Sequence, residues 1–340
     1  MRPRSLYMVF LVIPGIAVIL LFCIASAGII DHRHSAGSSW ADVEQTLGTR
    51  GTVLPDGVFM VELPRDDIQV SIGDMVLARP MALHSFVAFM NMGAQGSMVM
   101  GDLVLQPQEL FAVQSDLLRG GLEITAVHNT LVGETPQVYD VHFSGTGDPV
   151  KIASVVRTAL ESAKVPYQTF GAMHDDAMQS PIDTRPIDAA MGVKSAYEDG
   201  VIQYRVPRAD KITEGGMEIP QSMDVATSIR LQPLSGNRVA AAGEFVLLAG
   251  EVQPVMKALN RNGITVTATH THMLNEEPRL YYLHLWAVGD PVAVAKGLRE
   301  AIDQTNVKTV QPALVADRQE ESPRHTSHAS ISAFLSHESG

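Results

Sequence analysis

Hydrophobic and polar residues follow the same order in two halves of this chain. Short runs that are rich in β-branched and aromatic residues, or that alternate between apolar and polar residues, predict strands. In the first half these runs are Val58–Leu63, Phe86–Met90, Ser97–Leu105, Leu122–His128 and Val138–Phe143. In the second half they are Val201–Val206, Ser228–Leu231, Val239–Leu247, Ile264–His272 and Leu280–Trp286. In each half a short polar turn separates the last two runs, which predicts a hairpin.

Two segments in each half have the pattern of helices. Apolar residues recur at helical spacing in Gln108–Leu118 and Val252–Asn260, and both segments end near a glycine. Asp148-Pro149 and Asp290-Pro291 each place an N-cap acceptor before a proline at the first helical position. Each half therefore predicts an α+β unit, an antiparallel sheet with its helices on one face. We expect the two units to be related by a pseudo-twofold axis.

An internal repeat supports this division. His128–Pro149 and His270–Pro291 align without a gap, and 8 of the 22 positions are identical. We expect repeat 1 at residues 54–167 and repeat 2 at residues 197–310, joined by a linker at residues 168–196. Residues 31–53 are predicted to be a polar spacer, and the Ser-, His- and Glu-rich residues 311–340 a disordered tail.

Charge and cysteine content exclude several classes of protein. The net charge is −12 and no stretch is rich in Lys and Arg, which argues against a nucleic-acid-binding protein. The only cysteine, Cys23, lies in an N-terminal apolar run, so the folded part can form neither a disulfide nor a thiolate metal site. A metal would have to be held by histidine and carboxylate.

The N-terminal residues 1–30 predict export. Arg2 and Arg4 precede a long apolar run, Leu6–Ile30, and Ala25-Ser26-Ala27 fits a signal-peptidase site. The run is also long enough to span a bilayer as an uncleaved anchor. Under either interpretation the main body lies outside the cytoplasmic membrane and contacts the membrane only through this segment.

The repeated hairpin carries the residues with the clearest potential for chemistry. If the hairpin pairs His270 with His284, the imidazoles of His270, His272 and His284 face one side with Glu276 within reach, and the four residues would form a site for a divalent transition metal (zinc, copper or iron). The first copy offers a degenerate second site. Its residues are His128, Glu134 and His142, with Thr130 in place of one imidazole.

Several segments resemble the LppY/LpqO family of exported bacterial proteins, which carry a domain of unknown function. The resemblance rests on Val61–Asp67, Met98–Leu105 and the two histidine blocks, His128–His142 and His270–His284. It implies a duplicated, exported protein but no established activity. The family pattern has His-Asn-His at the hairpin, whereas this chain has His128-Asn129-Thr130 and His270-Thr271-His272.

Three functions remain open from the sequence. The leading hypothesis is an exported protein that binds a divalent metal or a small polar ligand at the repeat 2 hairpin. The second is a cell-envelope interaction or structural module in which the histidines only stabilise the sheet. The third, a metal-dependent enzyme, lacks a recognisable catalytic motif. A cluster of four methionines could bind Cu(I) but is more typical of core packing: Met90, Met92, Met98 and Met100. His84, in an apolar strand-like segment, is more typical of a core residue than of a metal ligand.

Overall fold

Two α+β units follow one another along the chain. A computed structural model describes residues 40–166 and 180–308. Each unit has a six-stranded antiparallel sheet, in the orders β1-β2-β5-β6-β9-β7 and β10-β11-β14-β15-β17-β16. The two orders correspond strand by strand, so the structure confirms the predicted duplication. The N-terminal apolar run and the tail histidines lie outside the described residues.

The elements of repeat 1 match the predicted runs closely. Its helices are α1 Trp40–Leu47, α2 Leu110–Arg119 and α3 Pro149–Ser162. Its sheet strands are β1 Thr52–Val53, β2 Phe59–Glu62, β5 Phe86–Asn91, β6 Ser97–Leu105, β7 Glu123–His128 and β9 Tyr139–Gly147. Repeat 1 also contains short elements outside this sheet, namely β3 Ser71–Ile72, β4 Met75–Val76, β8 Glu134–Thr135 and the 3-10 turns Arg79–Met81 and Gly93–Gln95.

Repeat 2 has the same three helices and six sheet strands in the same order. Its helices are α4 Arg185–Met191, α5 Ala249–Arg261 and α6 Pro291–Ile302. Its sheet strands are β10 Ala196–Glu198, β11 Val201–Pro207, β14 Ala226–Leu234, β15 Arg238–Leu248, β16 Thr265–His270 and β17 Leu280–Gly289. A small hairpin is formed by β12 Thr213–Glu214 and β13 Met217–Glu218.

Both closing helices begin as the Asp-Pro motif predicts. The Asp148 carboxylate accepts hydrogen bonds from Val150 N at 2.9 Å and Lys151 N at 3.3 Å. Asp290 accepts from Val292 N and Ala293 N in the same way, at 3.0 and 2.9 Å. These bonds satisfy amide groups that have no partner within the helix.

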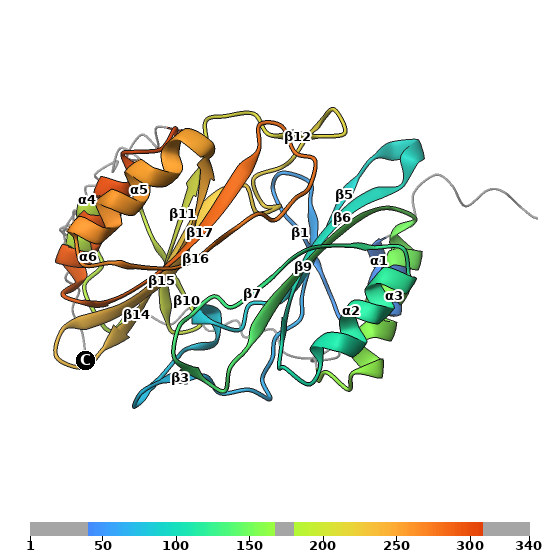
Figure 1. The fold of residues 1–340 in the computed structure, drawn as a ribbon, viewed down its shortest axis with the longest axis horizontal. Helices are drawn as coiled ribbons and strands as arrows, with labels where there is room; N and C mark the ends of the chain where they lie inside the picture. Colours follow the sequence, from blue (N-terminus) through green and yellow to red (C-terminus); the bar gives the residue numbers. More distant parts are fainter. Residues whose placement is uncertain (1–39, 167–179, 309–340) are drawn as a thin grey trace, which may run out of the picture.

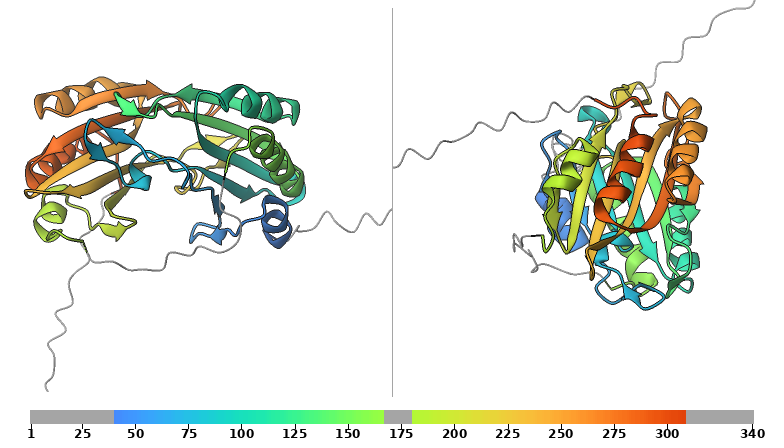
Figure 2. Two further views of the ribbon diagram at one scale, coloured as in Figure 1. Left: turned by 90° about the horizontal axis from the view of Figure 1, so that it is seen from below. Right: turned by 90° about the vertical axis from the view of Figure 1, so that its left-hand side faces the viewer.

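The helices of the two repeats lie on opposite outer sides of the molecule, with the two sheets between them (Figures 1 and 2). Alternation along the strands explains this arrangement. On β6, Val99, Leu103 and Leu105 pack into the core beneath helices α1–α3, and on β17, Leu283 and Leu285 pack beneath helices α4–α6. The residues between them face inward, toward the other repeat.

Each repeat extends an arm across the inner face of the other. Leu77 and Met81, from the segment between β2 and β5, pack in one cluster with Ala240 and Ala242 of β15. Ile212 and Met223, from the matching segment of repeat 2, pack with Phe86, Ala88 and Met100. The exchange joins the repeats through two mixed apolar cores. Met90 and Met92 pack against the second of these, in agreement with the core interpretation of the methionines.

Two helices lie where the sequence suggested a spacer and a linker. Helix α1 falls in residues 31–53 and α4 in residues 168–196. Both belong to the repeat cores, since Val43 and Leu47 of α1 and Ile187 and Met191 of α4 are fully or almost fully buried. Only about two turns long, these helices have too few residues to show a clear apolar period. Within the described residues, no helix is long and apolar enough to cross a bilayer.

Candidate metal centre

The inner faces of the two sheets bring polar residues together at the middle of the molecule. In repeat 1, Asp102 of β6 lies opposite His142 of β9. In repeat 2, Glu244 of β15 lies opposite His284 of β17. These pairs interrupt otherwise apolar strands at equivalent positions. Because their neighbours along each strand pack under the helices, all four side chains must face the other repeat.

The hairpins add an imidazole from each neighbouring strand. His128 lies opposite Asp140 and His270 opposite Tyr282, and each strand has a bulge before the histidine. The site predicted from the sequence assumed that His270 pairs with His284. The observed register does not pair them. Ala268 pairs with His284 instead. Because this offset is two residues, His270 and His284 still share one face.

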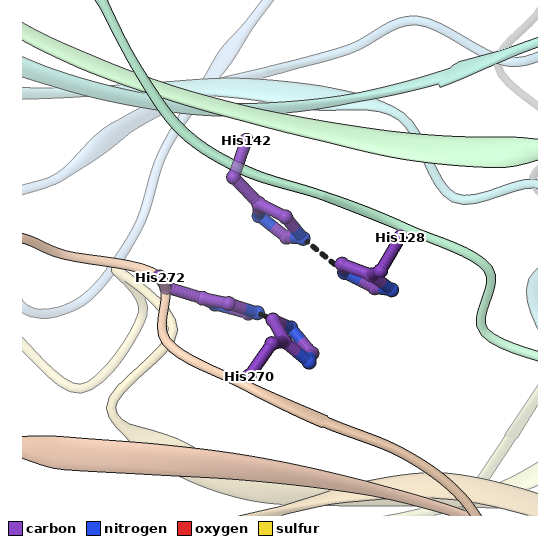
Figure 3. A group of neighbouring side chains, drawn as sticks. All are labelled: His128, His142, His270 and His272. Carbon is purple, nitrogen blue, oxygen red and sulfur yellow. Dashed lines mark hydrogen bonds between the residues drawn. The ribbon is translucent and has the colours of Figure 1, made fainter.

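Five imidazoles converge between the two sheets. Figure 3 shows four of them, two from each repeat. Within repeat 1, Nε2 of His128 lies 3.0 Å from Nε2 of His142, and within repeat 2, Nε2 of His270 lies 2.8 Å from Nε2 of His272. The rings meet across the pseudo-twofold axis, with centroids 3.7 Å apart for His128 and His270 and 3.8 Å apart for His142 and His272.

Two overlapping groups of side chains have the spacing of a metal site. We call His128, His142, His270 and His272 the four-imidazole group, and Glu244, His270, His272 and His284 the Glu244 group. In each, the possible ligand atoms lie within 4.8 Å of one another. Tetrahedral zinc, with Zn–N bonds of about 2.0–2.1 Å, separates its ligand atoms by about 3.3 Å. Both groups therefore need only small shifts to enclose an ion.

Glu244 is the carboxylate of this cluster. Its Oε2 lies 3.2 Å from Nε2 of His272 and 3.0 Å from Nε2 of His284. Burial would raise the pKa of Glu244, but the two histidines lower it well below its usual value. Burial would lower the pKa of His272, but Glu244 and Asp224 raise it to about 10. A buried ion pair thus occupies the Glu244 group.

Three of the imidazoles, those of His128, His142 and His270, are held in the neutral form. Burial lowers the pKa of His270, His128 and His142, and charged neighbouring histidines lower those of His270 and His142 further. Neutral imidazole is the form that binds a metal. Asp102 is the counterpart of Glu244, and burial with the nearby carboxylates of Asp140 and Asp224 raises its pKa well above the usual value.

Outer carboxylates lie behind two of the rings. Oδ2 of Asp224 lies 3.5 Å from Nδ1 of His272, and Oδ2 of Asp140 lies 4.0 Å from Nδ1 of His128. In both rings Nε2 is directed to the cluster. A carboxylate behind the second nitrogen is the usual companion of a metal-binding histidine, because it fixes the ring's direction and raises its basicity.

Glu276 and Glu134 do not join the cluster. Oε1 of Glu276 accepts a hydrogen bond from Leu280 N at 2.8 Å, and its Oε2 lies 3.3 Å from Nη1 of Arg279. Glu134 lies 3.4 Å from Nδ2 of Asn129. Both carboxylates make their contacts within their own hairpin turns. Neither belongs to a group of converging ligand atoms among the described residues. His128 and His142, expected to form a separate degenerate site, instead share one centre with His270 and His272.

A cavity of about 470 Å³ lies between the sheets beside the cluster. Its lining includes Asp102, Glu244, His272 and His284 from the cluster and the side chain of Arg230. The volume is in the range of small-molecule binding sites. His84 also lines this cavity, and burial together with Arg230 and Arg205 lowers its pKa to about 3. It lies outside both ligand groups.

The sequence offered one unused signal for the carboxylates. Gly101-Asp102 and Gly243-Glu244 stand at equivalent positions in the middle of apolar strands. An acidic residue kept in both copies of a buried strand indicates a shared polar environment. In contrast, Asp224 could not be found this way, because the matching position in repeat 1 is Ala82.

The fold and cluster define a protein of two tandem α+β units that share one histidine-rich centre. The profile of the family described as Domain of Unknown Function (DUF1259) matches residues 41–162 and 185–304, and the chain belongs to this family. The match begins within α1 in the first copy and at α4 in the second, which places both helices inside the repeats.

Other comparisons are distant. No curated protein matches the chain. Among solved structures, the trimeric bacterial microcompartment shell protein PduB is 12% identical, with 78% of this chain and 98% of that chain covered and a TM-score of 0.21. EtuB from Clostridium kluyveri is 11% identical, with 74% and 88% covered and a TM-score of 0.19. An unknown protein from Galdieria sulphuraria is 13% identical, with 62% and 93% covered and a TM-score of 0.17.

Proposed function

We propose that this protein is exported and binds one divalent transition metal ion, zinc, copper or iron, at the histidine cluster between its repeats. Within the described residues, the observation that carries the proposal is the convergence of five imidazoles and Glu244 from five strands and one loop. A purely structural role would not require so many rings from both repeats to direct Nε2 to one point.

The ligand set favours particular metals. Imidazole suits zinc, copper, iron and nickel, whereas calcium and magnesium prefer oxygen ligands. Of the two groups, we assign the ion to the Glu244 group, made of three imidazoles and one carboxylate. The carboxylate offsets part of the ion's charge in a buried site, whereas the four-imidazole group supplies no negative charge. Three members of the Glu244 group also line the cavity, which gives a ligand access to the ion.

Export is supported by the N-terminal sequence and by the resemblance to the LppY/LpqO family. Arg2 and Arg4 precede the apolar run Leu6–Ile30, as in a signal peptide or membrane anchor. A reporter that is active only in the cytoplasm, fused after Gly340, should give no signal. A strong signal would place the body of the protein in the cytoplasm and overturn this part of the proposal.

The metal is tested by elemental analysis of protein purified without chelators. Wild-type protein should carry a stoichiometric transition metal, and His270→Gln should lose it because His270 belongs to both groups. His84→Gln is the matched control, since His84 lines the same cavity but is in neither group. Wild-type protein that holds no metal, even after titration with zinc, copper or iron, would favour the interaction module over the metal-binding protein.

A metal-dependent enzyme is the second candidate. It is favoured by the polar cavity of about 470 Å³ that opens onto the proposed ligands His272 and His284. Such a cavity would bring a substrate to an open coordination position of the metal.

A further inference from the structure

Arg230 places a positive charge on the inner face of the repeat 2 sheet. Its neighbours on β14, Ile229 and Leu231, are fully buried beneath the helices, so Arg230 faces the cavity between the repeats. Its Nε is buried and has no hydrogen-bond partner among the described residues. An unsatisfied buried donor on a charged group is unfavourable unless a ligand or water completes its bonds.

The repeat itself shows that the fold does not need an arginine here. The equivalent residue of repeat 1 is Ala88, which is fully buried in the mixed apolar core with Phe86 and Met100. The same sheet position is therefore filled by apolar packing in one copy and left beside an open polar cavity in the other. This difference between two copies of one fold indicates a role for Arg230 outside structural stability.

Charges of both signs line the cavity around Arg230. The carboxylates of Glu244 and Asp224 lie close enough to Arg230 for their charges to interact, and so does the guanidinium of Arg205 on β11. Asp102, Asp224 and Glu244 also lie beside histidines of the cluster. A ligand that contacts both Arg230 and these carboxylates needs an anionic group for the first and hydrogen-bond donors for the second.

We propose that the cavity binds a small organic acid that also carries a hydroxyl or amino group. The anionic group would pair with Arg230, whose planar guanidinium suits an oxyanion, and the donor group would face Asp224 and Glu244 at the metal centre. The inference rests on the proposed function in one respect, because the bound metal offsets the negative charge of the cluster. Metal-loaded protein should therefore bind the acid more tightly than metal-free protein.

The test is calorimetric titration of metal-loaded full-length protein with glycerate and L-serine at millimolar concentration. Propionate, which lacks a donor group, and inorganic phosphate serve as comparison ligands. Arg230→Gln should weaken binding of glycerate or serine about 10- to 100-fold, the loss expected when a charge-assisted pair is removed. Arg238→Gln removes the same charge from an exposed residue of β15 and should bind as wild type does. Arg230→Ala, which copies Ala88, guards against misfolding of the glutamine variant.

The outcomes separate this inference from the metal proposal. Metal content should be the same in wild type and in the Arg230 variants, since Arg230 is in neither ligand group. Absence of metal from the wild type would contradict the proposed function, while Arg230-dependent binding of the acid would still support this site. The inference is wrong if neither acid binds, if propionate or phosphate binds as tightly, or if both Arg230 variants bind as wild type does.

Discussion

Replacing single members of the cluster should reveal which group holds the metal. His284→Gln and Glu244→Gln each remove a ligand found only in the Glu244 group, whereas His142→Gln removes one found only in the four-imidazole group. His142 still lies 3.8 Å from the ring of His272, so its loss changes packing near the site without removing a proposed ligand. We expect the first two variants to lose metal affinity and the third to retain most of it.

The expected size of the loss follows from the ligand number. Structural zinc sites with four ligands contribute about 10–16 kcal/mol at neutral pH, or about 2.5–4 kcal/mol for each ligand. A loss of about 2.5–4 kcal/mol lowers affinity by about 10²- to 10³-fold. His142→Gln should change affinity by about 10-fold or less, the lower end of the effect of residues that surround a metal site without binding it.

Competition titration with a chromophoric chelator measures these affinities. Glu276→Gln is the matched control for Glu244→Gln, because Glu276 is also buried but holds the hairpin turn through Leu280 N. The assignment to the Glu244 group would be refuted if His142→Gln lost as much affinity as His284→Gln. Equal affinity in wild type and His284→Gln would refute it as well.

Three further predictions concern protons and stability. The pKa of His272 is raised to about 10 by Glu244 and Asp224, so metal binding at pH 7 should displace its proton, measurable by calorimetry in buffers of different ionisation enthalpy. Burial lowers the pKa of His84 from 6.5 to about 3, so the free energy of unfolding should fall as the pH drops below 6.5. At pH 4.5 this loss should be about 2–3 kcal/mol, and urea denaturation should show that His84→Gln does not suffer it. Arg208→Met should lower the free energy of unfolding in urea by about 3–5 kcal/mol, because the fully buried Arg208 bonds Glu251 and Val246 O; an unchanged midpoint would contradict this.

The fold was largely predictable because its signals are local and occur twice. The strand runs, the Asp-Pro helix starts at Pro149 and Pro291, and the duplication are all present in the structure. Helices α1 and α4 were missed because they are short and their stability comes from packing on the repeat cores. The exchanged arms depend on contacts between residues far apart in the chain, such as the hydrogen bond that Ala78 N donates to Gln232 Oε1 at 2.8 Å, which no local pattern reveals.

The site was predictable only in part. The histidines were found because the hairpin is repeated, and the structure brings all five together. The sequence treated each hairpin as a site of its own, since spacing within one hairpin says nothing about how two repeats pack. For the same reason it selected Glu276, near in sequence, instead of Glu244, which comes from another strand.

Divergence between the repeats explains why one centre, rather than two, should bind metal. In repeat 1, Thr130 donates a hydrogen bond to Asp140 at 2.5 Å. The equivalent residues of repeat 2 are His272 and Tyr282, whose rings stack 3.6 Å apart. Asp102 is one methylene shorter than Glu244 and stays 3.9 Å from His142, whereas Glu244 lies within 3.2 Å of two imidazoles.

A second ion in the four-imidazole group would have to share His270 and His272 with the first. Two divalent ions about 4 Å apart repel by about 16 kcal/mol at an effective dielectric constant of about 20. Paired metal sites need negative ligands to offset this repulsion, but the two ligand groups contain only one carboxylate, Glu244. Retaining both sets of ligands would therefore add repulsion without adding a usable site. The loss of an imidazole at Thr130 and the longer carboxylate at Glu244 both favour a single ion, displaced from the axis toward repeat 2.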